Sequence, residues 1–338
     1  MLESHRAALA SDGFSVLRDQ VPEALRVRAL RAINRAMGEL VAGSSAAAAA
    51  GSGAASSGDE AAAAARSLAN GLQLPRLLAD PAVTALLTSS GLLTTLTELI
   101  QSSGSSEGHM EPAHMGQVAL RFPGDLCVPG TSSPQPSWSR GWHIDGLPFD
   151  LPAMPAGRID NFSCLVGVCL SDCLADNQGN LVVRPGSHWA MQDWLRDERN
   201  LREVLARGSK ALPRAPDDWS LPLHPPQQVK MRAGDVVVAH YSLAHSIAPN
   251  TGGAIRYMIY FRLCTPAHAA AVAGATSRYR PESIRDIFAD WPALSSHAAS
   301  AARVHRRNHA TMAAEWSEMG ALLFPSSFFL RRRARNRT

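Results

Sequence analysis

A series of short, β-rich runs in the second half of the chain limits the folds that it can adopt. Turn-forming sequences such as FPGD, DNQGN and PNTGG separate these runs, and no helical pattern lies between them. Many short strands without interleaved helices are typical of an antiparallel sandwich or barrel. We therefore predict a mainly β fold, with a β core carried on flanking helices from both ends of the chain. The runs are GQVALRF, NFSCLVGVCL, NLVVRP, DVVVAHYSLAHSI and IRYMIYFRL.

The patterns on either side of these runs divide the chain into segments. Near the N-terminus, the strand-like GFSVL is followed by a helical pattern in which Pro22 occupies the first turn. An alanine-, serine- and glycine-rich stretch then offers no large apolar group to bury, which predicts a flexible insert, although its alanines could also extend a neighbouring helix. The expected segments are an N-terminal strand and helix packing on the core (1–42), the flexible insert (43–66), a helical segment (67–110), the β core (111–264), a C-terminal helical segment (265–330) and a basic, disordered tail (331–338).

The composition excludes several classes of protein. Hydrophobic residues make up 46% of the 338 residues and charged residues 18%, which is typical of a globular chain. No apolar run reaches the ~18 residues of a membrane span, and the first residues lack the basic-then-apolar order of a secretory signal. The expected location is therefore the cytoplasm, with no membrane span.

The charges and cysteines narrow the choice of partners. The net charge is +4, but five arginines lie in the tail RRRARNRT, so the rest of the chain carries a balance of −1. A body so close to neutral offers no nucleic-acid footprint. The five cysteines match neither a zinc-site spacing nor a disulfide framework, which favours a reducing, intracellular compartment.

The sequence GWHIDGLPFD contains a histidine and an aspartate two residues apart. In an extended chain His143 and Asp145 would share one face, and Trp142 and Ile144 the other, because successive side chains alternate. An imidazole and a carboxylate on one face could be a hydrogen-bonded pair or two parts of a metal site. The pair alone does not decide between these functions.

A second histidine lies in DVVVAHYSLAHSIAPNTGGAIRYMIYFRL, which is typical of a hairpin with its turn near NTGG. If the turn is centred on Asn250 and Thr251, His245 lies opposite Arg256. Directly opposed residues of an antiparallel pair project from the same face, ~5 Å apart. We therefore expect His245 and Arg256 to lie side by side, and the planar fork of arginine suits a carboxylate.

Together, these residues predict a metal site with an anion anchor. His143, Asp145 and His245 would form a set of two histidines and one carboxylate, which leaves three metal positions open and suits non-haem iron(II). Arg256 would hold one end of a dicarboxylate such as 2-oxoglutarate while the other end chelates the metal, and dioxygen would take the last position. Two other functions remain open: a zinc hydrolase, because the same ligands suit zinc, and a non-catalytic, cupin-like protein that binds a small carboxylate.

The chain resembles the phytanoyl-CoA dioxygenase family of iron(II)- and 2-oxoglutarate-dependent oxygenases. The matching sequences are LASDGFSVL, WHID, LSDCLADNQGNLVVRPGSHW, HSIAPNTGGAIRYMIYFRL and RPESIRDIFADWPAL. The resemblance implies a double-stranded β-helix, a cupin-like jelly roll, with the metal at one open end. It implies iron(II) at His143, Asp145 and His245, and Arg256 at the distal carboxylate of 2-oxoglutarate. The implied activity is hydroxylation of an unactivated C–H bond of a small-molecule substrate by dioxygen, with decarboxylation of 2-oxoglutarate to succinate and CO2.

Further contacts are expected around this site. Strand alternation puts Gln117 and Arg121 on one face of the run before WHID, where family members often bind cosubstrate or substrate. Asn161 is a candidate polar contact to 2-oxoglutarate. Trp142 and Tyr260 are candidates for the wall of the pocket.

The chain departs from the family pattern in two places. Some members have a tryptophan near the cosubstrate on the strand after WHID, and NFSCLVGVCL has none. Many members carry a serine two residues past the second histidine, and its hydroxyl helps to bind the cosubstrate carboxylate. Here that position is Ile247, while Ser246 lies one place early and faces the other side. The sequence therefore identifies Arg256 as an anchor but leaves the other contacts to the carboxylate open.

Overall fold

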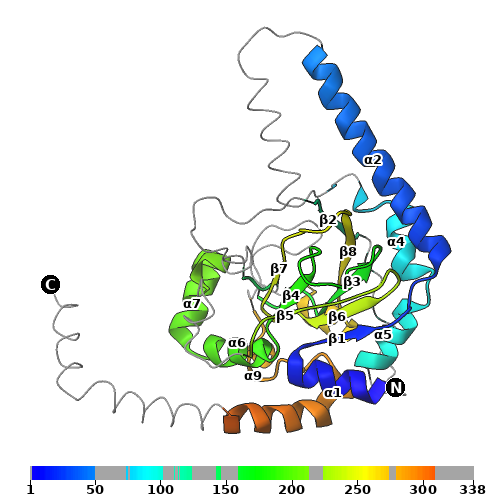
Figure 1. The fold of residues 1–338 in the computed structure, drawn as a ribbon. Helices are drawn as coiled ribbons and strands as arrows, with labels where there is room; N and C mark the ends of the chain where they lie inside the picture. The colour runs from blue at the N-terminus through cyan, green and yellow to red at the C-terminus, as the bar shows by residue number, and fades with distance from the viewer. Residues whose placement is uncertain are drawn as a thin grey trace, which may run out of the picture.

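Two antiparallel β-sheets form the centre of the molecule (Figure 1). The structure is a computed structural model, which describes residues 2–49, 74, 77–101, 110, 113, 115–123, 142–145, 159–212, 224–273 and 279–308. The larger sheet has the strand order β1-β6-β3-β8-β2, and the smaller has the order β5-β4-β7. The strands of the larger sheet, in this order, are β1 (Phe14–Leu17), β6 (Val236–His240), β3 (Cys164–Cys169), β8 (Arg256–Leu263) and β2 (Gln117–Arg121). Those of the smaller sheet are β5 (Gln227–Gln228), β4 (Leu181–Val183) and β7 (His245–Ile247).

Helices cover the outer sides of this pair of sheets, as Figure 1 shows. The larger sheet is covered by α1 (Leu2–Asp12), α2 (Glu23–Ala49), α4 (Pro81–Thr88) and α5 (Leu92–Ile100). Beside the smaller sheet lie α6 (Ser187–Leu195), α7 (Glu198–Arg207), the 3-10 turn η3 (Gly208–Ala211) and α9 (Pro281–Arg285). The chain also forms α8 (Pro266–Val272), the turn η5 (Pro292–Leu294) and a helix over residues 295–308.

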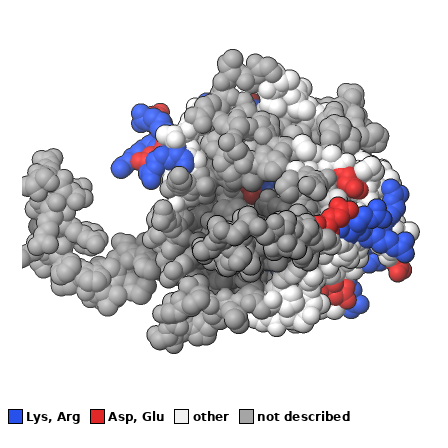
Figure 2. All heavy atoms as spheres, turned by 90° about the horizontal axis from the view of Figure 1, so that it is seen from above, with Lys and Arg blue, Asp and Glu red and all other residues white. Residues whose placement is uncertain are grey.

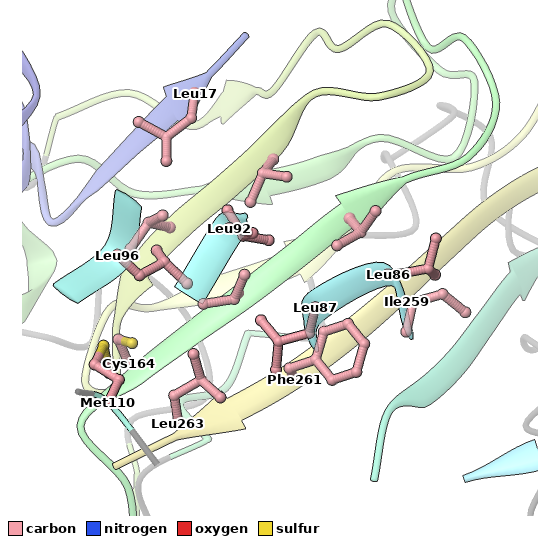
Figure 3. Packing of buried hydrophobic residues seen from close by; sticks show 14 of the residues in the cluster. Leu17, Leu86, Leu87, Leu92, Leu96, Met110, Cys164, Ile259, Phe261 and Leu263 are labelled. Atoms are coloured by element: carbon pink, nitrogen blue, oxygen red, sulfur yellow. The ribbon is translucent and has the colours of Figure 1, made fainter. Parts of the chain in front are cut away.

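The outer face of the larger sheet carries an extensive apolar cluster, part of which Figure 3 shows. Ile259, Phe261 and Leu263 of β8 join Leu86 and Leu87 of α4 in this cluster. Each of these side chains is at most 1% exposed. Burying a side chain of this size contributes about 1.5–3 kcal/mol, so the contact between sheet and helices is a main source of stability.

The inner face of the larger sheet packs against the smaller sheet. Met258 and Tyr260 of β8 share a second apolar cluster with Leu181 and Val183 of β4. Along β8 these inward residues alternate with the residues that face the helices, as a pleated strand requires. The even-numbered residues of β8 therefore point into the space between the two sheets.

A third apolar cluster covers the outer side of the smaller sheet. Trp142 and Ile144 lie in it with Val182 of β4 and Met191 of α6. The three clusters thus separate four layers: helices, the larger sheet, the smaller sheet and a second set of helices.

These observations confirm the predicted β core with flanking helices. Four of the five β-rich runs contribute one strand each, and DVVVAHYSLAHSI contributes both β6 and β7. The strand predicted near the N-terminus is β1, and Pro22 directly precedes α2. The description as mainly β holds for the core alone, because the helices outside it are long. The helix α2 has 27 residues, whereas β8 has 8.

Three helical features differ from the sequence-based expectation. The helices α6 and α7 lie between β4 and β5, inside the predicted β core (111–264) where no helical pattern was expected, so the flanking helices do not come from the two ends of the chain alone. The helix α2 continues through Ala49, so it includes the first residues of the stretch predicted as a flexible insert (43–66). Alanine has the highest helix propensity of all residues and extends a helix without an apolar face to bury. The helix α1 was not predicted. It buries only Leu9 and Ala10, so its sequence shows little of the apolar spacing that indicates a helix. The rest of the insert and the basic tail lie outside the described residues.

The predicted hairpin that opposes His245 and Arg256 is wrong. The strand β7, which begins at His245, pairs with β4 in the smaller sheet. The strand β8, which begins at Arg256, pairs with β2 and β3 in the larger sheet. The connection crosses between the sheets, and the side-chain amide of Asn250 supports it by donating to the carbonyl oxygens of Arg121 and Ala254. Turn formers indicate where a chain reverses, but they do not specify which sheet the next strand joins.

No single helix in the described part of the chain is long and apolar enough to cross a membrane. The helices α4 and α5, which meet at 47°, reach that length and composition only as a pair. Their apolar side chains, among them Leu86 and Leu96, are buried in the cluster on the larger sheet.

His240, the last residue of β6, is buried as a neutral side chain. Its Nε2 lies 2.9 Å from the carbonyl oxygen of Ile287, and its Nδ1 lies 3.2 Å from the backbone nitrogen of Ser242. The backbone N–H of Ser242 donates to Nδ1, so Nε2 carries the proton and donates to Ile287. Burial lowers the pKa of His240 to about 4, because a second proton would be added next to a donor in an apolar setting.

The free energy of unfolding is therefore expected to fall in mild acid. The unfolded chain takes up a proton at His240 near pH 6.5, whereas the folded chain resists protonation down to about 4. This contribution to stability is fully present above pH 6.5 and is lost as the pH falls toward 4, by up to ~1.4 kcal/mol per pH unit. Urea unfolding at several pH values in this window measures the slope, which should be smaller for His240→Gln. Equal slopes for the two proteins would contradict the prediction.

Candidate metal centre

The structure brings the side chains of His143, Asp145 and His245 together. Their potential ligand atoms all lie within 4.8 Å of one another. The backbones of the two histidines pair directly: the nitrogen of His143 lies 3.1 Å from the oxygen of His245, and the reverse distance is 2.9 Å. This antiparallel bridge brings the two imidazole rings together, with centroids 4.4 Å apart and planes tilted by 57°. The three residues predicted as metal ligands thus form one group in space.

Asp145 turns its Oδ1 atom toward both histidines. This oxygen lies 3.8 Å from Nε2 of His143 and 3.7 Å from Nε2 of His245. Two ligand atoms at right angles on a metal with bonds of about 2.1 Å are about 3.0 Å apart. The two distances from Oδ1 of Asp145 would therefore have to shorten by less than about 1 Å for this oxygen and either histidine to bind one ion.

His245 is held in the form that a metal requires. Its Nδ1 lies 2.9 Å from the carbonyl oxygen of Leu243. Because a carbonyl oxygen only accepts, Nδ1 carries the proton and Nε2 keeps its lone pair. Burial, together with the neighbouring His143, lowers the pKa of His245 to about 4. The ring is therefore neutral near pH 7 and ready to bind a metal without losing a proton.

Arg262, near the end of β8, engages the other oxygen of Asp145. Its Nη2 donates to Oδ2 of Asp145 at 2.7 Å. Asp145 is 5% exposed, and burial by itself raises its pKa. The positive charge of Arg262, together with those of His245 and His143 in their protonated forms, outweighs burial and holds the pKa of Asp145 below its usual value. Asp145 is therefore a carboxylate whose Oδ1 remains directed toward the histidines.

Sequence reasoning missed Arg262 as a site residue. Strand alternation could have found it, because Arg256 and Arg262 lie on the same face of β8. Gln117, predicted as a cosubstrate contact, accepts a hydrogen bond from Nη1 of Arg262 at 2.9 Å through its Oε1. Its link to the predicted metal ligands therefore runs through Arg262, and its contact with a cosubstrate stays a prediction.

Arg256, the first residue of β8, lies between the sheets and is 2% exposed. Its Nε donates to the carbonyl oxygen of Gly179 at 2.6 Å and its Nη1 to that of Ala119 at 3.1 Å. Its Nη2 is buried without a hydrogen-bond partner in the described part of the chain. Ala119 pairs with Met258, so the guanidinium reaches along β8 toward the end that carries Arg262.

Gly179 lets Arg256 and Arg121 approach the chain closely. Its φ of 72° favours glycine. A Cβ atom there would lie 2.9 Å from Cβ of Arg121 and 3.2 Å from Cβ of Arg256. In the sheet, Arg121 lies directly opposite Arg256. The two arginines therefore share a face, and binding by Arg121 stays a prediction.

The other predicted residues lie in three different surroundings. Asn161 is buried just before β3. The backbone N–H of nearby Ser163 donates to the carbonyl oxygen of Leu263, the last residue of β8. Asn161 therefore lies near the end of β8 that carries Arg262. Trp142 packs in the apolar cluster outside the smaller sheet, on the side of the chain opposite the metal ligands. Tyr260 lies on the inner face of β8.

Charged side chains at the surface mix both signs. In the view of Figure 2, lysines and arginines gather in two groups at the edges of the molecule, each with acidic side chains among them. The helix α7 is one such mixed element: Arg202 and Arg207 pair with Glu198 and Glu203 one turn earlier. Such exposed pairs contribute little to stability and partly cancel one another's charge.

Arg262→Met is expected to destabilise the metal-free protein, because Asp145 would keep a buried charge without its partner. Removing one member of a buried ion pair typically costs about 3–5 kcal/mol of unfolding free energy. Adding Asp145→Asn should recover part of this loss, since an amide carries no charge to compensate. Urea unfolding of the wild type, both single variants and the double variant measures the coupling. Losses that simply add would contradict the proposed pairing.

A comparison with protein families identifies a relationship over most of the chain. The family model described as phytanoyl-CoA dioxygenase (PhyH) matches residues 9–258. That range contains the three clustered side chains and Arg256. No curated protein matches the chain.

Several solved structures of low sequence identity also match. The carbocyclase SnoK from nogalamycin biosynthesis, described as non-heme and alpha-ketoglutarate-dependent, is 14% identical, with 82% of this chain and 92% of that chain covered and a TM-score of 0.45. HygX from Streptomyces hygroscopicus, with nickel and 2-oxoglutarate bound, is 15% identical, with 77% and 86% covered and a TM-score of 0.40. EctD from S. alaskensis, with iron bound, is 18% identical, with 78% and 77% covered and a TM-score of 0.40.

The assignment rests on the family model, which spans well over half of the chain. Members of this family are oxygenases that use iron(II), 2-oxoglutarate and dioxygen, and the chain is an enzyme of that class. Neither a zinc hydrolase nor a non-catalytic binding protein, the two other functions that the sequence left open, belongs to this class. The chain is a member of the phytanoyl-CoA dioxygenase family.

Proposed function

We propose that the protein hydroxylates an unactivated C–H bond of a small-molecule substrate, with iron(II) held by His143, Asp145 and His245. One observation carries the proposal. Three ligand atoms converge within 4.8 Å, and a buried arginine, Arg256, has a donor in the space between the same two sheets that no described residue engages. A dicarboxylate that chelates a metal at one end needs such an anchor at the other.

The fold that we propose is a double-stranded β-helix, or jelly roll. The order of the strands supports it, because the chain passes repeatedly between the sheets: β3 lies in the larger sheet, β4 and β5 in the smaller, β6 in the larger, β7 in the smaller and β8 in the larger. Two facing antiparallel sheets connected in this way are typical of jelly rolls. The proposed metal position would then lie at one end of the space between them.

The donor set suits a divalent metal with exchangeable ligands. Asp145 supplies the negative charge, and Arg262 engages its Oδ2, so that Oδ1 is the oxygen that faces the two histidines. The resulting set of two nitrogens and one oxygen would occupy one side of the ion. Such a set leaves positions open on the other side, as in non-haem iron oxygenases.

Arg256 would bind the distal carboxylate of 2-oxoglutarate. Its bonds to the carbonyl oxygens of Gly179 and Ala119 fix the plane of the guanidinium but do not neutralise its charge. The remaining Nη2 is a buried, charged donor, and a carboxylate is its strongest natural acceptor. The opposite end of the cosubstrate would then extend toward the metal ligands.

When bound, the metal and cosubstrate supply the oxidising chemistry, in which dioxygen is consumed, 2-oxoglutarate becomes succinate and CO2, and one oxygen atom enters the substrate. The side chains of the enzyme bind and orient the reactants. Leu165, Val183 and Val237 give the interior an apolar lining, which limits the access of water.

The test of this function is the anaerobic addition of iron(II) and 2-oxoglutarate to the metal-free protein. We expect a weak visible charge-transfer band that requires both additions, followed by succinate release when oxygen is admitted. Asp145→Ala should lose the band and bind iron(II) more weakly, because the ion loses both a bond and its anionic partner. Full hydroxylation by this variant would refute the ligand set. An Asp235→Ala variant, which alters a carboxylate bound to Arg18 at the distant end of β6, serves as the control.

Arg256→Ala should weaken 2-oxoglutarate binding by roughly a hundredfold or more, because charge-assisted hydrogen bonds in a buried site are lost. Iron binding should survive, since no ligand atom changes. Arg256→Lys should give an intermediate defect, because lysine restores the charge but not the planar fork. Calorimetric titration of the iron-loaded variants measures these affinities, with Arg202→Ala on α7 as a surface control. Wild-type affinity in the alanine variant would refute the anchor.

A further inference from the structure

Tyr260 occupies the middle of the inner face of β8, between Arg256 and Arg262. Its direct neighbours across the sheet are Gln117 of β2 and Gly167 of β3. The guanidinium of Arg256 reaches along the strand toward Tyr260, and Arg262 donates to Gln117 directly opposite. Tyr260 therefore lies on the path between the proposed anchor and the proposed metal ligands.

The aromatic ring of Tyr260 lies over Gly167. A Cβ atom at that glycine would come within 2.8 Å of Cε1 of the ring and within 2.8 Å of Cγ1 of Val237. The missing side chain thus makes room for the ring, which packs in the cluster between the sheets. Tyr260 is 8% exposed, so packing holds the ring and leaves the hydroxyl as its one polar group.

The hydroxyl of Tyr260 is buried without a hydrogen-bond partner among the described residues, and the same is true of Nη2 of Arg256. A buried polar group left unpaired costs about 1–3 kcal/mol, so natural structures rarely leave two of them on one face without a reason. Both groups donate, and both lie on the inner face of one strand. A single anionic acceptor between them would satisfy both.

The surroundings of the Tyr260 hydroxyl favour its protonated form, which can donate to an anion. Burial raises the pKa of Tyr260, so the hydroxyl keeps its proton near neutral pH and can donate. The positive charge of Arg256 acts to lower the same pKa, and the negative charge of Asp145 acts to raise it.

We propose that the hydroxyl of Tyr260 donates a hydrogen bond to the distal carboxylate of 2-oxoglutarate, beside Nη2 of Arg256. Tyr260 then supplies, from β8, the hydroxyl that many family members supply from a serine at the position of Ile247. The inference rests on the proposed role of Arg256 and adds a second contact to the same carboxylate. It makes Tyr260 a cosubstrate-binding residue.

The affinity of Tyr260→Phe for 2-oxoglutarate tests this role. The variant removes one oxygen atom and keeps the ring over Gly167, so the packing is preserved. The full-length, iron(II)-loaded protein is titrated anaerobically by calorimetry and by the charge-transfer band. Losing one hydrogen bond to a carboxylate should weaken binding roughly tenfold or more, with no change in iron affinity.

A ligand without the distal carboxylate separates a direct contact from an effect of packing. 2-Oxopentanoate has the same chain length and chelates through the same end, but it ends in a methyl group. Its affinity should be the same for the wild type and for Tyr260→Phe. An equal loss for both ligands, or no loss for 2-oxoglutarate, would overturn the inference.

Two further variants show which assignment fails if one does. Tyr257, on the outer face of β8, donates its hydroxyl to Oδ1 of Asn34 at 2.9 Å, so Tyr257→Phe is a matched control that should bind 2-oxoglutarate as the wild type does. If Arg256→Ala weakens binding and Tyr260→Phe does not, the role of Tyr260 alone is wrong. If neither weakens it, the cosubstrate anchor itself is wrong.

Discussion

The alternation of side chains along β8 connects the core of the protein to its proposed site. One face of this strand buries Ile259 and Phe261 against the helices, and the other carries Arg256, Tyr260 and Arg262 between the sheets. Because the period is two residues, a slip of one residue would move the arginines under the helices and the apolar side chains into the interior. The pairing of β8 with β2 and β3 that buries the core therefore also fixes the spacing of the two guanidinium groups.

Charge between the sheets is balanced at one end of this strand and unbalanced at the other. Arg262 forms an ion pair with Asp145, whereas among the described residues Arg256 bonds only to the carbonyl oxygens of Gly179 and Ala119. Carbonyl groups satisfy donors but leave the positive charge in place, and a buried charge without a counter-ion is costly. A dicarboxylate cosubstrate would supply the missing negative charge. If Arg256 binds the cosubstrate as proposed, the positive charge of Arg256 is balanced when the cosubstrate is bound.

Local sequence patterns predicted the strands and the clustering of His143 with Asp145, because alternation depends on the residues themselves and on no distant partner. The proximity of His245 to Arg256 was derived from a hairpin, and that derivation was wrong because the two strands belong to different sheets. The pairing of Arg262 with Asp145 joins segments far apart in the sequence, and no local pattern specifies such a contact. What the sequence could not supply was the path of the chain from one sheet to the other.

The backbone bridge between His143 and His245 has a consequence beyond catalysis. It joins two segments that are separated by about a hundred residues, and closing so long a loop costs conformational entropy when the chain folds. An ion held by both segments would bind the folded form in preference to the unfolded one and would shift the folding equilibrium by mass action. Scarcity of iron in the cell would then lower the fraction of folded enzyme as well as slow its catalysis.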